Sequence, residues 1–320
     1  MAMNDYTGRA QAAAPGHATA VCALLAGALV WGLAWYPFRA LRDAGIGGEL
    51  ASTITYLVAL AIGAIAYRKQ LGGMRPDAML LAIALASGAC NVGFVLATIY
   101  GSVARAVLLF YLAPAWTVVF AYLLLGERLS AAGFRLSLLA LAGALVMLWN
   151  EELGMPWPGN VWEWIALGSG VLFALANVLV RKAQDHTIER KSLFVFAGCA
   201  ATALCATLLA PAGPPLLASM SLNSTLLLLL IGIVLWAVNY AVQFGLGRVP
   251  ANQAIVIYLS ELLFAAGSSW LLAGETLDVK ECTGGLMIVA ASLLSGRLRP
   301  PSAMPPVGAV APPDRARVRL

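Results

Sequence analysis

The sequence predicts an all-α polytopic membrane protein with ten transmembrane helices, arranged as two inverted five-helix repeats with both termini in the cytoplasm. Three observations support this: the composition, the spacing of apolar runs and an internal repeat. Of the 320 residues, 61% are hydrophobic and 11% are charged, and the mean hydropathy is +0.84. Soluble domains carry about 25% charged residues. The composition therefore excludes an ordinary soluble enzyme, and its high apolar fraction excludes a disordered chain.

Ten apolar runs are long enough to cross a bilayer, which takes about 20 mainly apolar residues. In chain order they are His17–Phe38, Gly48–Tyr67, Asp77–Thr98, Val103–Leu125, Leu129–Trp149, Trp162–Val180, Ser192–Ala210, Leu222–Leu246, Ala251–Ala273 and Glu281–Ser295. The uncharged stretch 192–247 holds two of them, because a Pro- and Gly-rich segment at 211–215 divides it. The last run is the shortest, and we expect it to extend by a residue at each end.

The Lys and Arg residues are distributed unevenly between the two sides of these runs. Sixteen of the 20 lie on the side that carries both termini, and four lie on the other side: Arg39, Arg42, Arg105 and Lys280. Basic residues are in excess in the cytoplasmic loops of membrane proteins. We therefore expect cytoplasmic termini and a location in the plasma membrane, which is the inner membrane of a bacterium. The net charge of +5 then reflects orientation in the membrane and not nucleic-acid binding.

The runs divide the chain into five segments. Two predicted repeats of five spans each, 17–150 and 162–298, are joined by a linker at 151–161 on the periplasmic side. A cytoplasmic N-terminal tail, 1–16, precedes them. The C-terminal tail, 299–320, is rich in Pro and Arg, and we expect it to be disordered.

The internal repeat is visible in two motifs. The segment LLLGERL (Leu123–Leu129) closes the fourth span and LLAGETL (Leu271–Leu277) closes the ninth, with five of seven positions identical. Upstream, Ala104–Leu112 aligns with Ala251–Leu259. Since each repeat holds an odd number of spans, the second must be inserted upside down. Inverted repeats of this kind occur in secondary transporters, whose substrates bind near the midplane between the repeats.

The motifs also resemble those of a known family. The opening helix carries LVWGLAW (Leu29–Trp35), and YLAP (Tyr111–Pro114) leads into LGERL (Leu125–Leu129). These features resemble the EamA-type transporters of the drug/metabolite transporter superfamily over residues 18–298. The resemblance implies export of small metabolites or amino acids, and a central cavity lined mainly by spans 1, 3, 4, 6, 8 and 9. It leaves the cargo open, because the family's members carry very different compounds.

One position departs from the family's pattern. Members often have a proline after the Tyr-Leu element in both repeats. The first repeat keeps Pro114, but the aligned residue in the second repeat is Glu261. The kink that the resemblance implies in the ninth span is therefore expected to be absent.

Glu261 is the formally charged residue nearest the middle of any span. Ionisable residues inside the membrane are functional by default, because they are costly there unless protonated, paired or hydrated. Glu261 is the candidate for proton coupling or for binding an ammonium group, and the alternative is a protonated carboxyl that fixes helix packing. Tyr258, three residues earlier, shares its helix face and is a candidate binding residue.

The remaining binding candidates are polar and aromatic residues in other spans. In span eight, spacings of three and four place four such residues on one predicted stripe; helix–helix packing is the alternative. In span one, Trp35 is a candidate, with an interfacial aromatic belt as the alternative. Asn177 in span six is expected to make a helix–helix hydrogen bond. The candidates besides Glu261 and Tyr258 are Trp236, Asn239, Tyr240, Gln243, Tyr111, Asn91, Phe94 and Trp35.

The sequence contains no motif that indicates a metal site, a nucleotide-binding site or an enzyme. The five cysteines show no CxxC spacing and the two histidines lie in polar segments, so we expect no metal site and no other cofactor. There is no GxxxxGK[ST] element for a nucleotide and no HExxH, which makes a membrane-embedded enzyme the least favoured class.

The predicted function is a secondary transporter that exports small metabolites, most of all amino acids or related organic compounds, by alternating access, with proton coupling as an option. A multidrug or organic-cation exporter of the same fold is the alternative. The expected partners are a small-molecule substrate and membrane lipid, without nucleic acid. A second copy is a further candidate, because Gly and Ala in spans five and ten permit close packing within or between chains.

Overall fold

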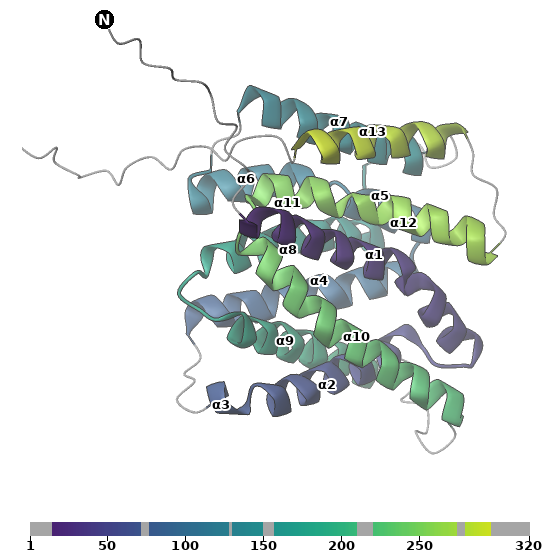
Figure 1. The fold of residues 1–320 in the computed structure, drawn as a ribbon. Coiled ribbons are helices and arrows are strands. Elements are labelled where there is room, and N and C mark those ends of the chain that lie inside the picture. The colour runs from purple at the N-terminus through teal and green to yellow at the C-terminus, as the bar shows by residue number, and fades with distance from the viewer. Residues whose placement is uncertain are drawn as a thin grey trace, which may run out of the picture.

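The computed structural model describes residues 15–71, 77–127, 130–149, 157–209, 220–273 and 279–295. Within these ranges every regular element is a helix, and the helices form one bundle (Figure 1). Most of the two predicted tails, most of the linker at 151–161 and Glu275 of the second repeated motif lie outside the described residues.

The helices follow the predicted runs closely. They are α1 (Pro15–Asp43), α2 (Gly48–Ala66), α3 (Arg68–Leu71), α4 (Ala78–Tyr100), α5 (Val103–Phe110), α6 (Ala113–Leu125), α7 (Ala131–Leu148), α8 (Val161–Lys182), α9 (Ile188–Leu209), α10 (Leu222–Leu246), α11 (Ala251–Tyr258), α12 (Ser260–Ser268), the π-helix Ser269–Ala273 and α13 (Val279–Ser295). Nine helical stretches in the described part of the chain are long and apolar enough to cross a membrane, α5 with α6 and α11 with α12 each counting as one. The tenth predicted span corresponds to α13, whose described part has 17 residues.

Polar side chains mark the beginnings of several helices. Asp77 accepts a hydrogen bond from the backbone N–H of Leu80 at the start of α4, and Ser130 does the same for Gly133 at the start of α7. Ser221 caps α10 in the same way. These side chains accept hydrogen bonds from backbone N–H groups that have no partner within the helix. The helices therefore begin at these residues.

Both long spans that carry the Tyr-Leu element are interrupted at the same point. In the fourth span α5 ends at Phe110, a turn follows at 111–112, and Pro114 sits in the first turn of α6. In the ninth span α11 ends at Tyr258 and α12 begins at Ser260. Leu259, between the two helices, keeps a helical backbone (φ −59°, ψ −17°), so the division is a local change in hydrogen bonding, and the expected absence of a kink in this span stays a prediction. In both spans the turn makes tighter i→i−3 backbone bonds, so the break does not depend on a proline.

The two sequence halves do not form separate bodies. Helix α4 packs along α8 and α9, α2 packs along α9, and α1 packs along α10 and α12 (Figure 1). Each of these pairs joins a helix of the first predicted repeat to a helix of the second. The two halves of the sequence are thus interleaved in one bundle.

Glycines allow the closest of these contacts. A Cβ atom built on Gly198 of α9 would lie 2.0 Å from the carbonyl oxygen of Ala84 in α4, and one on Gly88 would lie 2.5 Å from the oxygen of Gly198. Gly143 of α7 and Gly284 of α13 are closely opposed in the same way, since a Cβ atom on either would meet the carbonyl oxygen of the other. Small residues let helix backbones approach in membranes, and at these two crossings they are used within one chain.

Large apolar side chains cover the outside of the bundle. Examples are Leu123 of α6 and Leu293 of α13, each 67% exposed, while alanines such as Ala59 and Ala166 are fully buried. A soluble protein rarely exposes so many large apolar residues. The arrangement is that of a multi-pass membrane protein, with its apolar surface turned toward lipid.

Candidate substrate cavity

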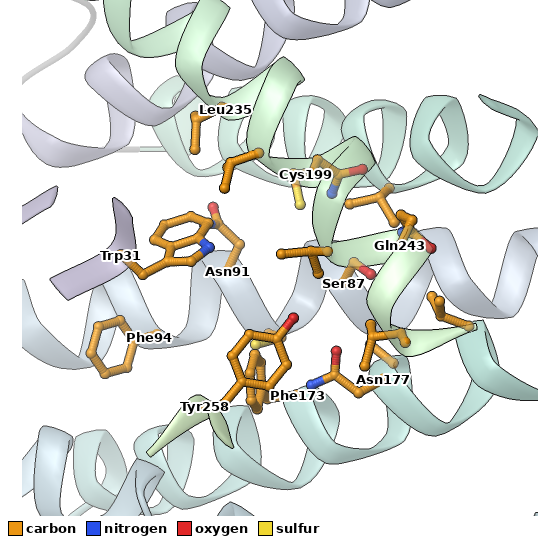
Figure 2. Close-up of a pocket in the computed structure, with 18 of the residues that line it drawn as sticks. Trp31, Ser87, Asn91, Phe94, Phe173, Asn177, Cys199, Leu235, Gln243 and Tyr258 are labelled. Atoms are coloured by element: carbon orange, nitrogen blue, oxygen red, sulfur yellow. The ribbon is translucent and has the colours of Figure 1, made fainter. Parts of the chain in front are cut away.

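A cavity of about 230 Å³ lies in the middle of the bundle (Figure 2). Its wall includes residues from the six spans that the resemblance implies, and also Tyr56 of α2 and Cys199 of α9. The polar and polarisable lining residues are Tyr56, Ser87, Cys90, Asn91, Tyr111, Asn177, Cys199, Asn239, Gln243, Tyr258 and Glu261. Pockets of this character, mostly apolar with a few placed polar groups, are typical of small-molecule sites.

The structure brings together seven of the ten residues proposed from sequence. The lining includes Glu261, Tyr258, Asn239, Gln243, Tyr111, Asn91 and Phe94. They come from α4, α10, α11, α12 and the turn between α5 and α6. Residues far apart in sequence thus meet in one cavity, which makes them candidates to contact a substrate.

Two of the span-eight residues lie elsewhere. The ring of Tyr67, at the end of α2, lies 6.2 Å from that of Trp236 and 6.5 Å from that of Tyr240, measured between centroids. Trp236 and Tyr240 form one i, i+4 row that contacts α2, while Asn239 and Gln243 form the adjacent row that lines the cavity. The single predicted stripe is therefore two stripes, because four residues spaced by three and four cover a wider arc of the helix than one wall needs.

Trp35 also lies outside the lining. Its Nε1–H donates a hydrogen bond to Ser268 Oγ at 2.9 Å, which joins α1 to α12. Trp31, one turn earlier, lines the cavity and is 36% exposed. The spacing of the two tryptophans was visible in the sequence, but not the direction in which each one points.

Several lining residues were missed or read differently from sequence. Asn177 lines the cavity, and its buried Nδ2 atom has no partner among the described groups, so the expected helix–helix hydrogen bond does not form through this atom. Ser87 was missed although it lies four residues before Asn91, a spacing that places both on one face of a helix. Tyr56 gave no such signal, since its neighbours in the sequence are apolar or small.

Aromatic rings form a continuous wall of the cavity. The ring of Phe110 lies 4.8 Å from that of Phe94 and 5.3 Å from that of Phe173, and the ring of Phe173 lies 5.8 Å from that of Tyr258. Figure 2 shows the Tyr258 ring beside Phe173, and both line the cavity. These tilted and edge-on contacts fix the ring positions, so the wall presents a preformed aromatic surface.

Glu261 supplies the formal charge of the lining. Its carboxylate lies close enough to the Tyr111 hydroxyl to interact with it. Among the lining residues that the structure describes there is no Lys, Arg or His. The described lining therefore presents a single carboxyl group beside aromatic rings.

Side-chain amides line the rest of the wall and are incompletely paired. Asn91 donates to the Tyr56 hydroxyl at 3.1 Å, but its Oδ1 atom is buried without a partner in the described protein. The same holds for Asn239 Oδ1 and Gln243 Oε1. Buried polar atoms are normally hydrogen-bonded, so these groups are available to a bound molecule.

An ion-pair cluster lies beyond one end of the cavity. Arg181 Nε donates to Glu127 Oε1 at 2.9 Å, and the same guanidinium donates to the carbonyl of Gly247. Glu127 also accepts from the backbone N–H of Ala251. The lining residues next to this cluster, such as Val180, are buried, so the cavity is closed at what we call the Glu127 end.

A second ion pair lies at the opposite end of α8. Arg105 donates to Glu163 at 2.8 Å and to the carbonyl of Trp157 at 2.7 Å. Glu163 also accepts from the Gly159 N–H and from Asn160 Nδ2. Across the described residues, no three His, Cys, Asp or Glu side chains are grouped so that they could hold a metal ion.

The sequence matches known proteins over most of its length. Relatives include an uncharacterized transporter of Archaeoglobus fulgidus, 28% identical over 225 residues, which are 70% of this chain and 78% of that protein. A pseudopaline exporter, CntI of Pseudomonas aeruginosa (strain UCBPP-PA14), is 28% identical over 202 residues, 61% of this chain and 66% of the exporter.

A solved structure shares the fold. It is described only as "Crystal structure of protein", and it superimposes with a TM-score of 0.72 at 20% identity, covering 89% of this chain and 98% of that one. The model of the EamA-like transporter family matches twice, over residues 18–149 and 160–297. The relatives and the family are named as transporters and not as enzymes, and the chain belongs to the EamA-like transporter family of the drug/metabolite transporter superfamily.

Proposed function

We propose that this protein is a secondary exporter of small organic compounds that carry an amino group, such as amino acids and related molecules. The observation that carries the proposal is the central cavity, in which a lone carboxylate lies among aromatic rings and incompletely paired amides. The name of the pseudopaline exporter among the relatives supports the direction of transport.

The proposed topology has ten spans in two inverted repeats, with both termini in the cytoplasm of a bacterial cell. Two matches to one family model, at 18–149 and 160–297, support two related units, predicted at 17–150 and 162–298. The basic residues support the orientation. In this orientation the Glu127 end of the cavity is cytoplasmic, and the closed end faces the cell interior.

Glu261 is the proposed coupling residue. A carboxylate in the cavity can hold either a proton or the ammonium group of a cargo, but not both. If protons enter from outside as the cargo leaves, this competition couples export to the proton gradient. Tyr111 supports the role, since its hydroxyl can interact with the carboxylate in one state and be released in another.

The cycle proposed here is alternating access by movement of helices around the cavity. The interleaved packing favours moving groups that mix helices of both repeats, because α4 packs on α8 and α9, and α1 packs on α10 and α12. Opening toward the cytoplasm then requires the contacts of Glu127 with Arg181 and Ala251 to separate.

The test uses purified full-length protein in liposomes loaded with a mixture of amino acids and amines. We expect saturable loss of a few compounds, faster with a pH gradient than without one. Glu261→Gln should abolish the response to the gradient and leave downhill exchange at higher cargo concentration. Glu49→Gln is the matched control, because Glu49 lies in the first turn of α2 and does not line the cavity.

Two outcomes would contradict the proposal. If no compound leaves faster than from protein-free liposomes, the cavity does not serve export of these solutes. If Glu261→Gln still concentrates cargo under a pH gradient, the coupling role of Glu261 is wrong. Conductance without saturation would instead indicate a passive channel.

A further inference from the structure

The described lining of the cavity contains an acidic side chain but no basic one. Glu261 carries the one carboxyl group of the described lining. Two cations near the Glu127 end lie outside the described lining: Arg181 binds Glu127 and the Gly247 carbonyl, and Lys191 donates to the Val180 carbonyl at 3.2 Å. A carboxylate on a cargo would therefore be buried without a cationic partner, which is strongly unfavourable.

An ammonium group meets the opposite situation. It would find the Glu261 carboxylate, and beside it the ring of Tyr258 three residues earlier on the chain. The rings of Phe110 and Phe173 continue this wall. Aromatic faces attract cations, most strongly where water is excluded. The wall also offers an apolar surface on which a flat ring of the cargo can lie.

The closed end of the cavity is polar but neutral. Gln243 is 2% exposed, and its Oε1 atom has no partner among the described groups. Asn177 of α8 has an unpartnered Nδ2, and Asn239, one turn nearer the middle of α10 than Gln243, has an unpartnered Oδ1. In Figure 2 the side chains of Asn177 and Gln243 both lie on the side of Tyr258 away from Trp31 and Phe94. Amides both donate and accept hydrogen bonds, so they suit a neutral hydroxyl or amide group.

We infer that the cavity selects aromatic amines that lack a free carboxylate and carry a neutral hydrogen-bonding group at the far end from the amine. The ammonium binds at Glu261, the ring lies on the Phe110–Phe173–Tyr258 wall, and the neutral polar group reaches Asn177, Asn239 and Gln243. This inference rests on the proposed function and narrows its substrate class, because it excludes zwitterionic amino acids.

Four matched probes separate the parts of this inference. Tyramine has the ammonium, the ring and a hydroxyl; tyrosine adds a carboxylate; phenethylamine lacks the hydroxyl; and 3-(4-hydroxyphenyl)propionate replaces the amine by a carboxylate. Equilibrium binding to the purified full-length protein is measured for each. We expect tyramine to bind about tenfold or more tightly than each of the other three.

Two asparagines provide a matched pair of variants. Asn239 and Asn252 each have a buried Oδ1 without a described partner, but only Asn239 lines the cavity. Asn239→Leu should weaken tyramine binding about tenfold and leave phenethylamine binding unchanged, which also shows that the variant is folded. Asn252→Leu should leave both unchanged. Glu261→Gln should remove the preference for tyramine over the propionate.

Tyrosine binding as tightly as tyramine would overturn the inference, and so would equal effects of Asn239→Leu on tyramine and phenethylamine. Transport in liposomes is measured separately. If tyrosine is exported and tyramine is not, the export proposal stands and the substrate class is wrong. If tyramine binds selectively but does not cross, the substrate class stands and the export proposal fails.

Discussion

Arg181 Nε lies 2.9 Å from Glu127 Oε1, and this pair joins the end of α8 to the end of α6. At the opposite end of α8, Arg105 and Glu163 join its beginning to the beginning of α5 at 2.8 Å. Helix α8 and the α5–α6 span therefore run in the same direction and are tied at both ends. The first helix of the second predicted repeat is held along a helix of the first.

Removing one member of the Arg181 pair should destabilise the protein. Glu127→Ala leaves a largely buried guanidinium without its carboxylate and Ala251 without an acceptor. We expect a loss of about 1–2 kcal/mol of unfolding free energy, measured by thermal unfolding in detergent. Arg42→Ala is the control: its pair with Asp43 is mostly exposed, so little change is expected. Equal effects of the two variants would refute the expectation.

Arg105 and Glu163 should be energetically coupled. Both side chains are largely buried, and Glu163 accepts from Arg105, Gly159 and Asn160. A double-mutant cycle with Arg105→Gln and Glu163→Gln should give a coupling free energy of about 1–3 kcal/mol. Purely additive effects would mean that the ion pair contributes nothing beyond the separate contacts of each side chain.

The crossing of α4 and α9 should not tolerate a methyl group. Because a Cβ on Gly198 would meet the backbone of Ala84, Gly198→Ala should push the helices apart and lower stability by about 1–3 kcal/mol. Gly168→Ala is the matched control, since a Cβ there meets nothing within 4 Å and alanine favours the helix. Comparison of the two melting temperatures tests the expectation, which fails if Gly198→Ala melts no lower than Gly168→Ala.

The ring of Tyr258 should matter more than its hydroxyl for the shape of the cavity. The residue is 5% exposed and packs edge-on against Phe173. Tyr258→Phe should therefore reduce cargo binding less than Tyr258→Ala, in an equilibrium binding measurement. An equal loss in both variants would assign the effect to the hydroxyl instead.

Substitution of Trp35 should affect stability, and substitution of Trp31 should affect cargo binding. Trp35→Phe removes the hydrogen bond to Ser268 and should lower stability by about 1 kcal/mol without changing cargo affinity. Trp31→Phe changes the cavity wall and should weaken cargo binding with little effect on stability. Binding and unfolding measurements on the same preparations distinguish these outcomes, and a loss of affinity in Trp35→Phe would contradict the placement of its side chain.

Most of the helices could be predicted from sequence because lipid imposes a strong rule: each span must be long, apolar and internally hydrogen-bonded. The start of α4 at Asp77 is an example, since a charged residue that can cap a helix precedes an unbroken apolar run. The interruption at Leu259 was not predictable in this way, because no proline marks it and the tighter turn arises in the folded span.

The cavity was predictable where polarity is conspicuous in an apolar span, as for Glu261 and Gln243. It was not predictable where the choice depends on rotation of a helix by part of a turn. Trp31 and Trp35 lie on neighbouring turns of α1, and only packing against α12 decides which one faces the cavity. Tyr56 enters the wall because α2 packs along α9, a contact between residues far apart in the sequence.

The interleaved packing has a consequence for biosynthesis. Helices α1 and α4 leave the ribosome early, but the neighbours along which they pack most extensively belong to α8, α9, α10 and α12. These early helices are inserted before their main neighbours exist, so they cannot complete their packing until the helices of the second half follow. The Gly88–Gly198 crossing can close only once α9 has been inserted, so the packing of the bundle lags behind the insertion of its first helices.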